Sequence, residues 1–166
     1  MTDDISSIAY HEAGHAVIAV ILGGEVLSLT LEPDDVETLP ERAGEVSIRW
    51  HHRGVSKREL IQREVITCLA GPAAEMIYRG EEVDPQSVAE WRYDWEIAWQ
   101  LSGLLIKAPQ PRTQILEGLL AELCRMLQRD ACWQAIAETA DQLEAHETLD
   151  GDEVHQIVAR WIGEAT

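Results

Sequence analysis

The sequence has few basic residues: thirteen Lys and Arg stand against thirty Asp and Glu, and the formal net charge is −17. Such a chain repels a phosphate backbone, and its positive charges are scattered rather than clustered, so we do not expect nucleic-acid binding. An anionic membrane surface is disfavoured for the same reason. The longest apolar run, residues 16–22, has seven residues and is too short to span a bilayer.

Cysteine is also scarce. Cys68, Cys124 and Cys132 are an odd number, lie far apart and form no C-x-x-C pair, so we expect reduced thiols and a cytoplasmic location. The N-terminus lacks the basic segment that opens a signal peptide. Phe is absent, although 46% of the 166 residues are apolar. This composition is enough for a hydrophobic core, and we expect a single domain over residues 1–166.

What the sequence does contain is an H-E-x-x-H pattern, formed by His11, Glu12 and His15. Helical periodicity surrounds it, and positions i and i+4 of a helix lie on one face, so the two histidines point the same way. Two neutral imidazoles so placed can hold a zinc ion, and Glu12 can act as general base for the zinc-bound water that attacks a carbonyl carbon. The alternative is a helix whose histidines are ordinary surface or core residues. The apolar face that flanks the motif favours the metal site.

The periodicity predicts a mainly helical α+β domain with a small β-sheet beside the motif helix. We expect an N-terminal arm, a first helix from about Ser7 to Leu22, and strands over residues 25–32 and 44–51 that pair antiparallel. If one edge of this sheet is open, an extended peptide could add as a further strand. The alternative is a structural sheet whose edge is covered.

Capping patterns and prolines delimit the helices that follow. A capping box at Ser56 predicts a helix to about Tyr78, and Pro72 should end or kink it near Gly71, or open a second helix. A second box at Ser87 opens the next helix. Three amphipathic helices complete the chain, over residues 112–129, over residues 131–145 and from a third capping box at Asp150 onward. Loops are expected over residues 33–43 and 81–86.

Asp94 lies in the helix that carries Trp91, Trp95 and Trp99 on one face, which we interpret as packing aromatics rather than a ligand cage. An aspartate in such surroundings costs free energy if it is buried without a partner. From the residues alone, Asp94 could be exposed, paired with a cation, or a metal ligand.

Residues 9–17, A-Y-H-E-A-G-H-A-V, are the first of four segments, in order, that resemble the FtsH-type, ATP-dependent zinc proteases of the M41 peptidase family, and they are similar to the active-site helix of that family. Residues 69–75, L-A-G-P-A-A-E, resemble its L-G-G-R-A-A-E segment. Residues 93–98 resemble its N-D-L-x-x-A-T helix, and residues 147–154, E-T-L-D-G-D-E-V, its C-terminal segment. Together they extend over nearly the whole chain.

The resemblance implies a mostly helical protease domain with a small β element and a zinc ion held by two histidines and an aspartate. Carried over by position, His11, His15 and Asp94 would be the zinc ligands and Glu12 the general base. Glu75 is the alternative third ligand, although a hydrogen bond to a zinc histidine that fixes its tautomer is the preferred role for it.

The chain departs from the family pattern in four respects. It has no G-x-x-x-x-G-K-[ST] loop and no transmembrane anchor, Pro72 replaces the family's arginine, and the segment before Asp94 differs. We therefore expect a soluble zinc metalloendopeptidase that cleaves extended or unfolded polypeptides, with a separate unfoldase or a protease as a possible partner. The alternative is a catalytically weak or inactive adaptor of the same fold that binds unfolded segments or a protease. The sequence does not indicate the oligomeric state.

Overall fold

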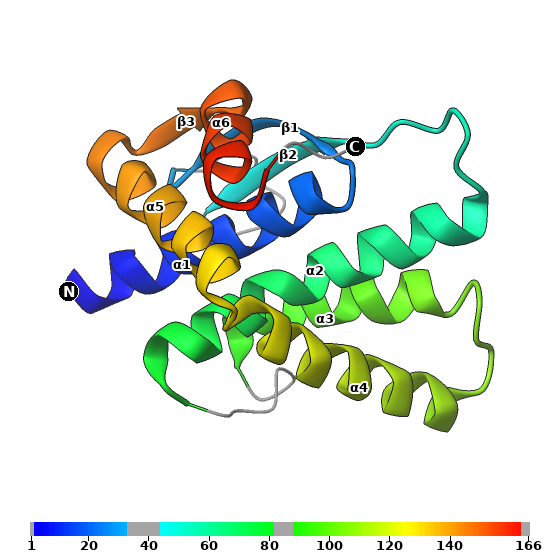
Figure 1. Ribbon diagram of the computed structural model, residues 1–166. Helices are drawn as coiled ribbons and strands as arrows, with labels where there is room; N and C mark the ends of the chain where they lie inside the picture. Colours follow the sequence, from blue (N-terminus) through cyan, green and yellow to red (C-terminus); the bar gives the residue numbers. More distant parts are fainter. Residues whose placement is uncertain (1, 33–43, 82–87, 164–166) are drawn as a thin grey trace.

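The computed structural model describes residues 2–32, 44–81 and 88–163 (Figure 1). These residues form a mainly helical domain with a three-stranded antiparallel sheet, as the sequence predicts. The elements are α1 (Thr2–Ile21), β1 (Glu25–Thr30), β2 (Glu45–Arg49), α2 (Lys57–Arg79), α3 (Ala89–Ser102), α4 (Pro109–Leu127), α5 (Asp130–His146), β3 (Thr148–Asp150) and α6 (Gly151–Ile162). The loops expected over residues 33–43 and 81–86 lie outside the described residues, except for Glu81. None of the described helices is long and apolar enough to cross a membrane.

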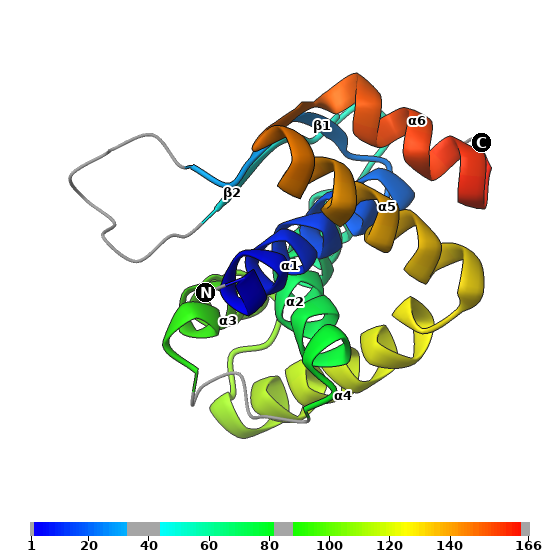
Figure 2. The same ribbon diagram turned by 90° about the vertical axis from the view of Figure 1, so that its left-hand side faces the viewer.

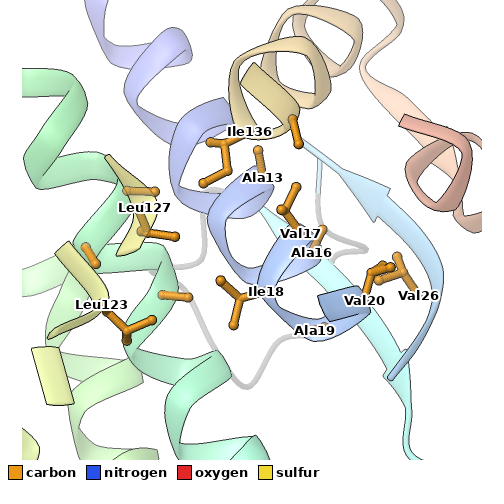
Figure 3. Close-up of a cluster of buried hydrophobic side chains, with 14 of the residues drawn as sticks. Ala13, Ala16, Val17, Ile18, Ala19, Val20, Val26, Leu123, Leu127 and Ile136 are labelled. Atoms are coloured by element: carbon orange, nitrogen blue, oxygen red, sulfur yellow. The ribbon is translucent and has the colours of Figure 1, made fainter. Parts of the chain in front are cut away.

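Helix α1 lies at the centre, between the sheet and α2 (Figures 1 and 2). It packs most extensively on α2 and also contacts α5, α6, β1 and β2. Figure 3 shows the core where α1 meets Ile136 of α5 and Val26 of β1. Every residue from position 11 to position 20 is buried, so this part of α1 is enclosed on all sides. Polar side chains in this stretch must therefore find their partners inside the protein.

The close approach of α1 and α2 depends on Gly14. A Cβ at this position would lie 2.6 Å from the carbonyl oxygen of Ala70 and 2.6 Å from Cβ of Ala74. A glycine inside a helix costs about 1 kcal/mol relative to alanine. Here it lets the two backbones touch, which brings the small-residue segment of α2 against the H-E-x-x-H turn.

Two helix boundaries differ from the sequence prediction. Helix α1 begins at Thr2, so the expected arm and the helix start near Ser7 are wrong; no proline or glycine interrupts the chain before Ser7. Helix α2 continues through Pro72, so it neither ends there nor gives way to a second helix. Proline inside a helix costs about 3 kcal/mol. Because every residue from Leu69 to Met76 is buried, tertiary packing offsets this cost.

Two of the three predicted capping boxes are present in the structure. The boxes at Ser56 and Asp150 are both present, with reciprocal side-chain and backbone hydrogen bonds. Helix α3 instead has Val88 at its N-cap, without a side-chain cap, and Ser87 lies outside the described residues. The stripe of tryptophans on α3 does pack as expected: Trp95 joins the hydrophobic core, and Trp99 stacks with Arg112 of α4.

The sheet has the strand order β2-β1-β3. The pairing of β1 with β2 is antiparallel, as predicted, but it skips Leu27 between Val26 and Ser28, which marks a β-bulge. The bulge turns Leu27 outward, where 37% of it is exposed, whereas Val26 and Leu29 are buried. Leucines alternate with other residues at positions 27, 29 and 31 and predict one apolar face for this strand, and the exposed Leu27 shows that this prediction is wrong. Strand β3 was not predicted, because three residues give too short a pattern.

Candidate metal centre

Five ionisable side chains meet where α1, α2 and α3 pack together. They are His11, Glu12 and His15 of α1, Glu75 of α2 and Asp94 of α3, and each is at most 9% exposed. No other histidine, aspartate or glutamate is buried in the part of the chain that the structure describes. Because burying charged groups is costly, one concentrated cluster of them is a candidate functional site.

Three of these residues direct one ligand atom each to a common point. Nε2 of His11 lies 2.8 Å from Oδ2 of Asp94 and 3.1 Å from Nε2 of His15, and the remaining pair, His15 and Asp94, is 3.4 Å apart. Tetrahedral zinc with bonds of about 2.0–2.1 Å separates its ligand atoms by about 3.3 Å. The three side chains therefore fit a metal ion. Of the alternatives left open for Asp94, surface exposure is excluded.

The other ring nitrogen of each histidine is held by a hydrogen-bond acceptor. Nδ1 of His11 donates to Oε2 of Glu75 at 2.9 Å, and Nδ1 of His15 donates to the carbonyl oxygen of Thr67 at 2.7 Å. A proton on Nδ1 leaves the lone pair of a neutral imidazole on Nε2, which is the form that binds metals. The hydrogen bond expected from Glu75 is thus present, and Glu75 lies on the side of the ring opposite the common point. Sequence reasoning missed Thr67, because a main-chain carbonyl leaves no signal in the sequence.

The charges of the cluster also favour a cation. Three buried carboxylates, those of Glu12, Glu75 and Asp94, belong to the cluster, and Arg79 pairs with Oε1 of Glu75 at 2.5 Å. With both histidines neutral, Asp94 directs a negative charge at the point where the three ligand atoms meet, and a divalent cation there would be attracted by it.

In the metal-free protein, protons bound to the histidines supply positive charge beside the carboxylates. Burial by itself lowers the pKa of His11, but hydrogen bonds to Asp94 and Glu75 and the nearby charges raise it to about 10. Burial likewise lowers the pKa of His15, and the charge of Asp94 and its hydrogen bond raise it overall. Burial raises the pKa of Asp94, but His15 and His11 hold it well below its ordinary range. Metal and proton thus compete for the same Nε2 atoms.

Glu12 lies between this cluster and the start of β2. Gly44, the residue before β2, sits against its side chain: a Cβ on Gly44 would lie 2.6 Å from Cγ and 2.7 Å from Oε1 of Glu12. The charge of Glu12 raises the pKa of both histidines, which places it near their rings. The sequence indicated Gly44 only as the beginning of a strand. The carboxylate is therefore positioned beside the candidate metal site, next to a strand at the edge of the sheet.

Gly71 closes the site from the side of α2. A Cβ on this residue would lie 2.3 Å from Nε2 of His15 and 2.8 Å from Nε2 of His11. Both rings are held at Nδ1 and cannot easily withdraw. We therefore expect Gly71→Ala to weaken zinc binding at least about tenfold, the scale on which disturbed ligand orientation acts. Competition with a fluorescent chelator would measure the dissociation constant.

Gly118→Ala on α4 provides the matched control, because nothing lies within 4 Å of a Cβ there. Both changes replace a helical glycine by alanine, which favours the helix by up to about 1 kcal/mol. Zinc affinity should stay at the wild-type value in Gly118→Ala. If Gly71→Ala also retains wild-type affinity, the metal does not occupy the space between the two histidines.

No protein-family model matches the sequence, and a search of curated proteins finds no match. The donor atoms, the burial and the charges of this site are therefore the basis for its function.

Proposed function

We propose that the protein is a zinc-dependent metalloendopeptidase that hydrolyses peptide bonds in extended or unfolded polypeptides. The observation that carries this proposal is the convergence of two imidazole nitrogens and one carboxylate oxygen, from His11, His15 and Asp94, with Glu12 beside them. A structural zinc site usually has four protein ligands, whereas catalytic sites keep one position open. The four segments that resemble the M41 family support the same activity.

The residues of the site have distinct roles in this reaction. A bound zinc ion would polarise the scissile carbonyl and make water a better nucleophile. Glu12 accepts the proton of the attacking water and is placed to return it to the leaving amine nitrogen. Glu75 and the carbonyl of Thr67 hold the two rings in the tautomer that presents Nε2. At 7% exposure, Glu12 is largely shielded from bulk water, so its carboxylate interacts strongly with charges nearby.

The position of β2 supports an extended substrate. Among the described residues β2 pairs only with β1, so its other side is an edge of the sheet. The strand starts next to Gly44, whose backbone touches Glu12. A peptide that adds to this edge would bind through its main chain and pass the general base. Such binding tolerates many sequences but requires an unfolded segment, and we propose that a separate unfoldase supplies one where the substrate is folded.

Zinc content and cleavage of an unfolded substrate test this function together. Purified protein should contain one zinc per chain by elemental analysis and should cleave casein. A chelator should stop the cleavage, and added zinc should restore it. A chain that binds zinc but leaves casein intact would point to the non-catalytic adaptor, and a chain that takes up no zinc would contradict the metal centre.

A further inference from the structure

We propose that Trp91 is a positioning residue for the metal centre, which orients the ligand His11 through Glu75. This role rests on the proposed metal site. The indole Nε1 of Trp91 donates a hydrogen bond to Oε2 of Glu75 at 2.5 Å. The same oxygen accepts the Nδ1 proton of His11 at 2.9 Å. One carboxylate oxygen thus connects the tryptophan to the metal-facing ring.

These hydrogen bonds connect three helices, α1, α2 and α3. Trp91 and Asp94 are three residues apart on α3 and share a face of that helix. Asp94 contacts Nε2 of His11 directly, and Trp91 reaches Nδ1 of the same ring by way of Glu75. Helix α3 therefore acts on both nitrogens of one imidazole. A rotation or slide of α3 would disturb the third ligand and the orientation of the first together.

Glu75 needs such a restraint because a second donor competes for it. Arg79, one turn further along α2, pairs with Oε1, and its side chain is 35% exposed. Without the indole, Oε2 of Glu75 would be held by His11 alone, while the partly exposed arginine would still pull on Oε1. The indole N–H keeps the other oxygen on His11, and at 4% exposure Glu75 has little access to water in its place.

Simple core packing is the competing explanation for a tryptophan that is 1% exposed. A comparison of Trp91 with Trp95 distinguishes packing from the role in the metal centre. Trp91 and Trp95, one turn apart on α3, are both buried core residues, but among the described contacts it is the indole N–H of Trp91 that donates a hydrogen bond to a residue of the metal centre. The role of Trp91 thus lies in its hydrogen bond as well as in its volume.

Trp91→Phe tests the proposal, since it keeps an aromatic ring and removes the N–H donor. We expect about tenfold weaker zinc binding in chelator competition, and a changed visible spectrum when cobalt replaces zinc, because outer partners tune metal sites by about 10- to 100-fold. Trp95→Phe is the control, with the same loss of volume at a similar depth. It should lower the unfolding temperature comparably while leaving zinc affinity and the cobalt spectrum as in the wild type.

A double-mutant cycle with Glu75→Ala shows whether Trp91 acts through Glu75. Without the carboxylate there is nothing for the indole to hold, so adding Trp91→Phe should not weaken zinc binding further. Wild-type zinc affinity in Trp91→Phe, or additive effects in the cycle, would overturn the proposal. Wild-type protein that binds neither metal would overturn the metal centre and this role with it. Protein that binds zinc without cleaving casein would refute only the peptidase function.

Discussion

Glu12→Gln is expected to remove peptide-bond cleavage and to leave zinc binding unchanged. The amide cannot accept the proton of the attacking water, and positioned acid–base groups typically contribute about 100- to 10,000-fold to a rate. The substitution keeps the size of a side chain that is 7% exposed and packed against Gly44, so the fold should tolerate it. Casein cleavage and zinc content would be measured on the same preparation.

The control for this change is Glu64→Gln, the same substitution at a partly buried glutamate that lies outside the site. Glu64 is a partly buried glutamate of α2, about two turns before Gly71. Its amide variant should cleave casein at the wild-type rate. Persistent cleavage in Glu12→Gln, beyond any contaminating protease, would show that another group serves as the base or that the reaction is different.

Asp94→Ala is expected to abolish both zinc binding and cleavage. It removes one of three ligand atoms, and we expect a loss of affinity beyond the factor of about 100 that outer partners contribute. The change also leaves the buried, protonated His11 without the carboxylate at Nε2, and breaking such a pair typically costs about 3–5 kcal/mol of stability. Zinc content, casein cleavage and the unfolding temperature should therefore all fall.

Asp94→Asn separates the loss of the ligand from the loss of stability. The amide oxygen can still accept a hydrogen bond from His11, but it carries no charge and is a poor zinc ligand. Circular dichroism should show a folded protein with little bound zinc. If Asp94→Asn retains one tightly bound zinc, the third ligand is another residue, with Glu75 the first to examine.

The parts of the site that could be predicted are those encoded locally or by a family pattern. The spacing of His11 and His15 within one helix places both rings on one face, as the structure shows. Asp94 is 83 residues from His11, and from the residues alone its role stayed open; only the resemblance pointed to it. The roles of Gly71 and Gly44 depend on how backbones pass the side chains of α1, which no local pattern contains.

In the fold, too, local signals could be predicted from the sequence, and contacts between distant segments could not. Helical periodicity and two capping boxes located most of the helices, because these signals act within a few residues. Pro72 does not end α2, because the burial of the surrounding segment outweighs the low helix propensity of proline. The bulge at Leu27 arises from pairing with a second strand, and Trp91 was read as packing because its hydrogen-bond partner lies on another helix.

The proposed ligands lie far apart in the sequence, and this determines when the site can form during folding. The histidine pair lies on α1, while the carboxylate lies on α3 and arrives 83 residues later. A nascent or partly unfolded chain therefore presents only two imidazoles, and the full donor set exists only after α1 and α3 have come together. If the proposed site binds zinc, metal uptake is linked thermodynamically to folding, and the free energy of binding the ion adds to the stability of the native state.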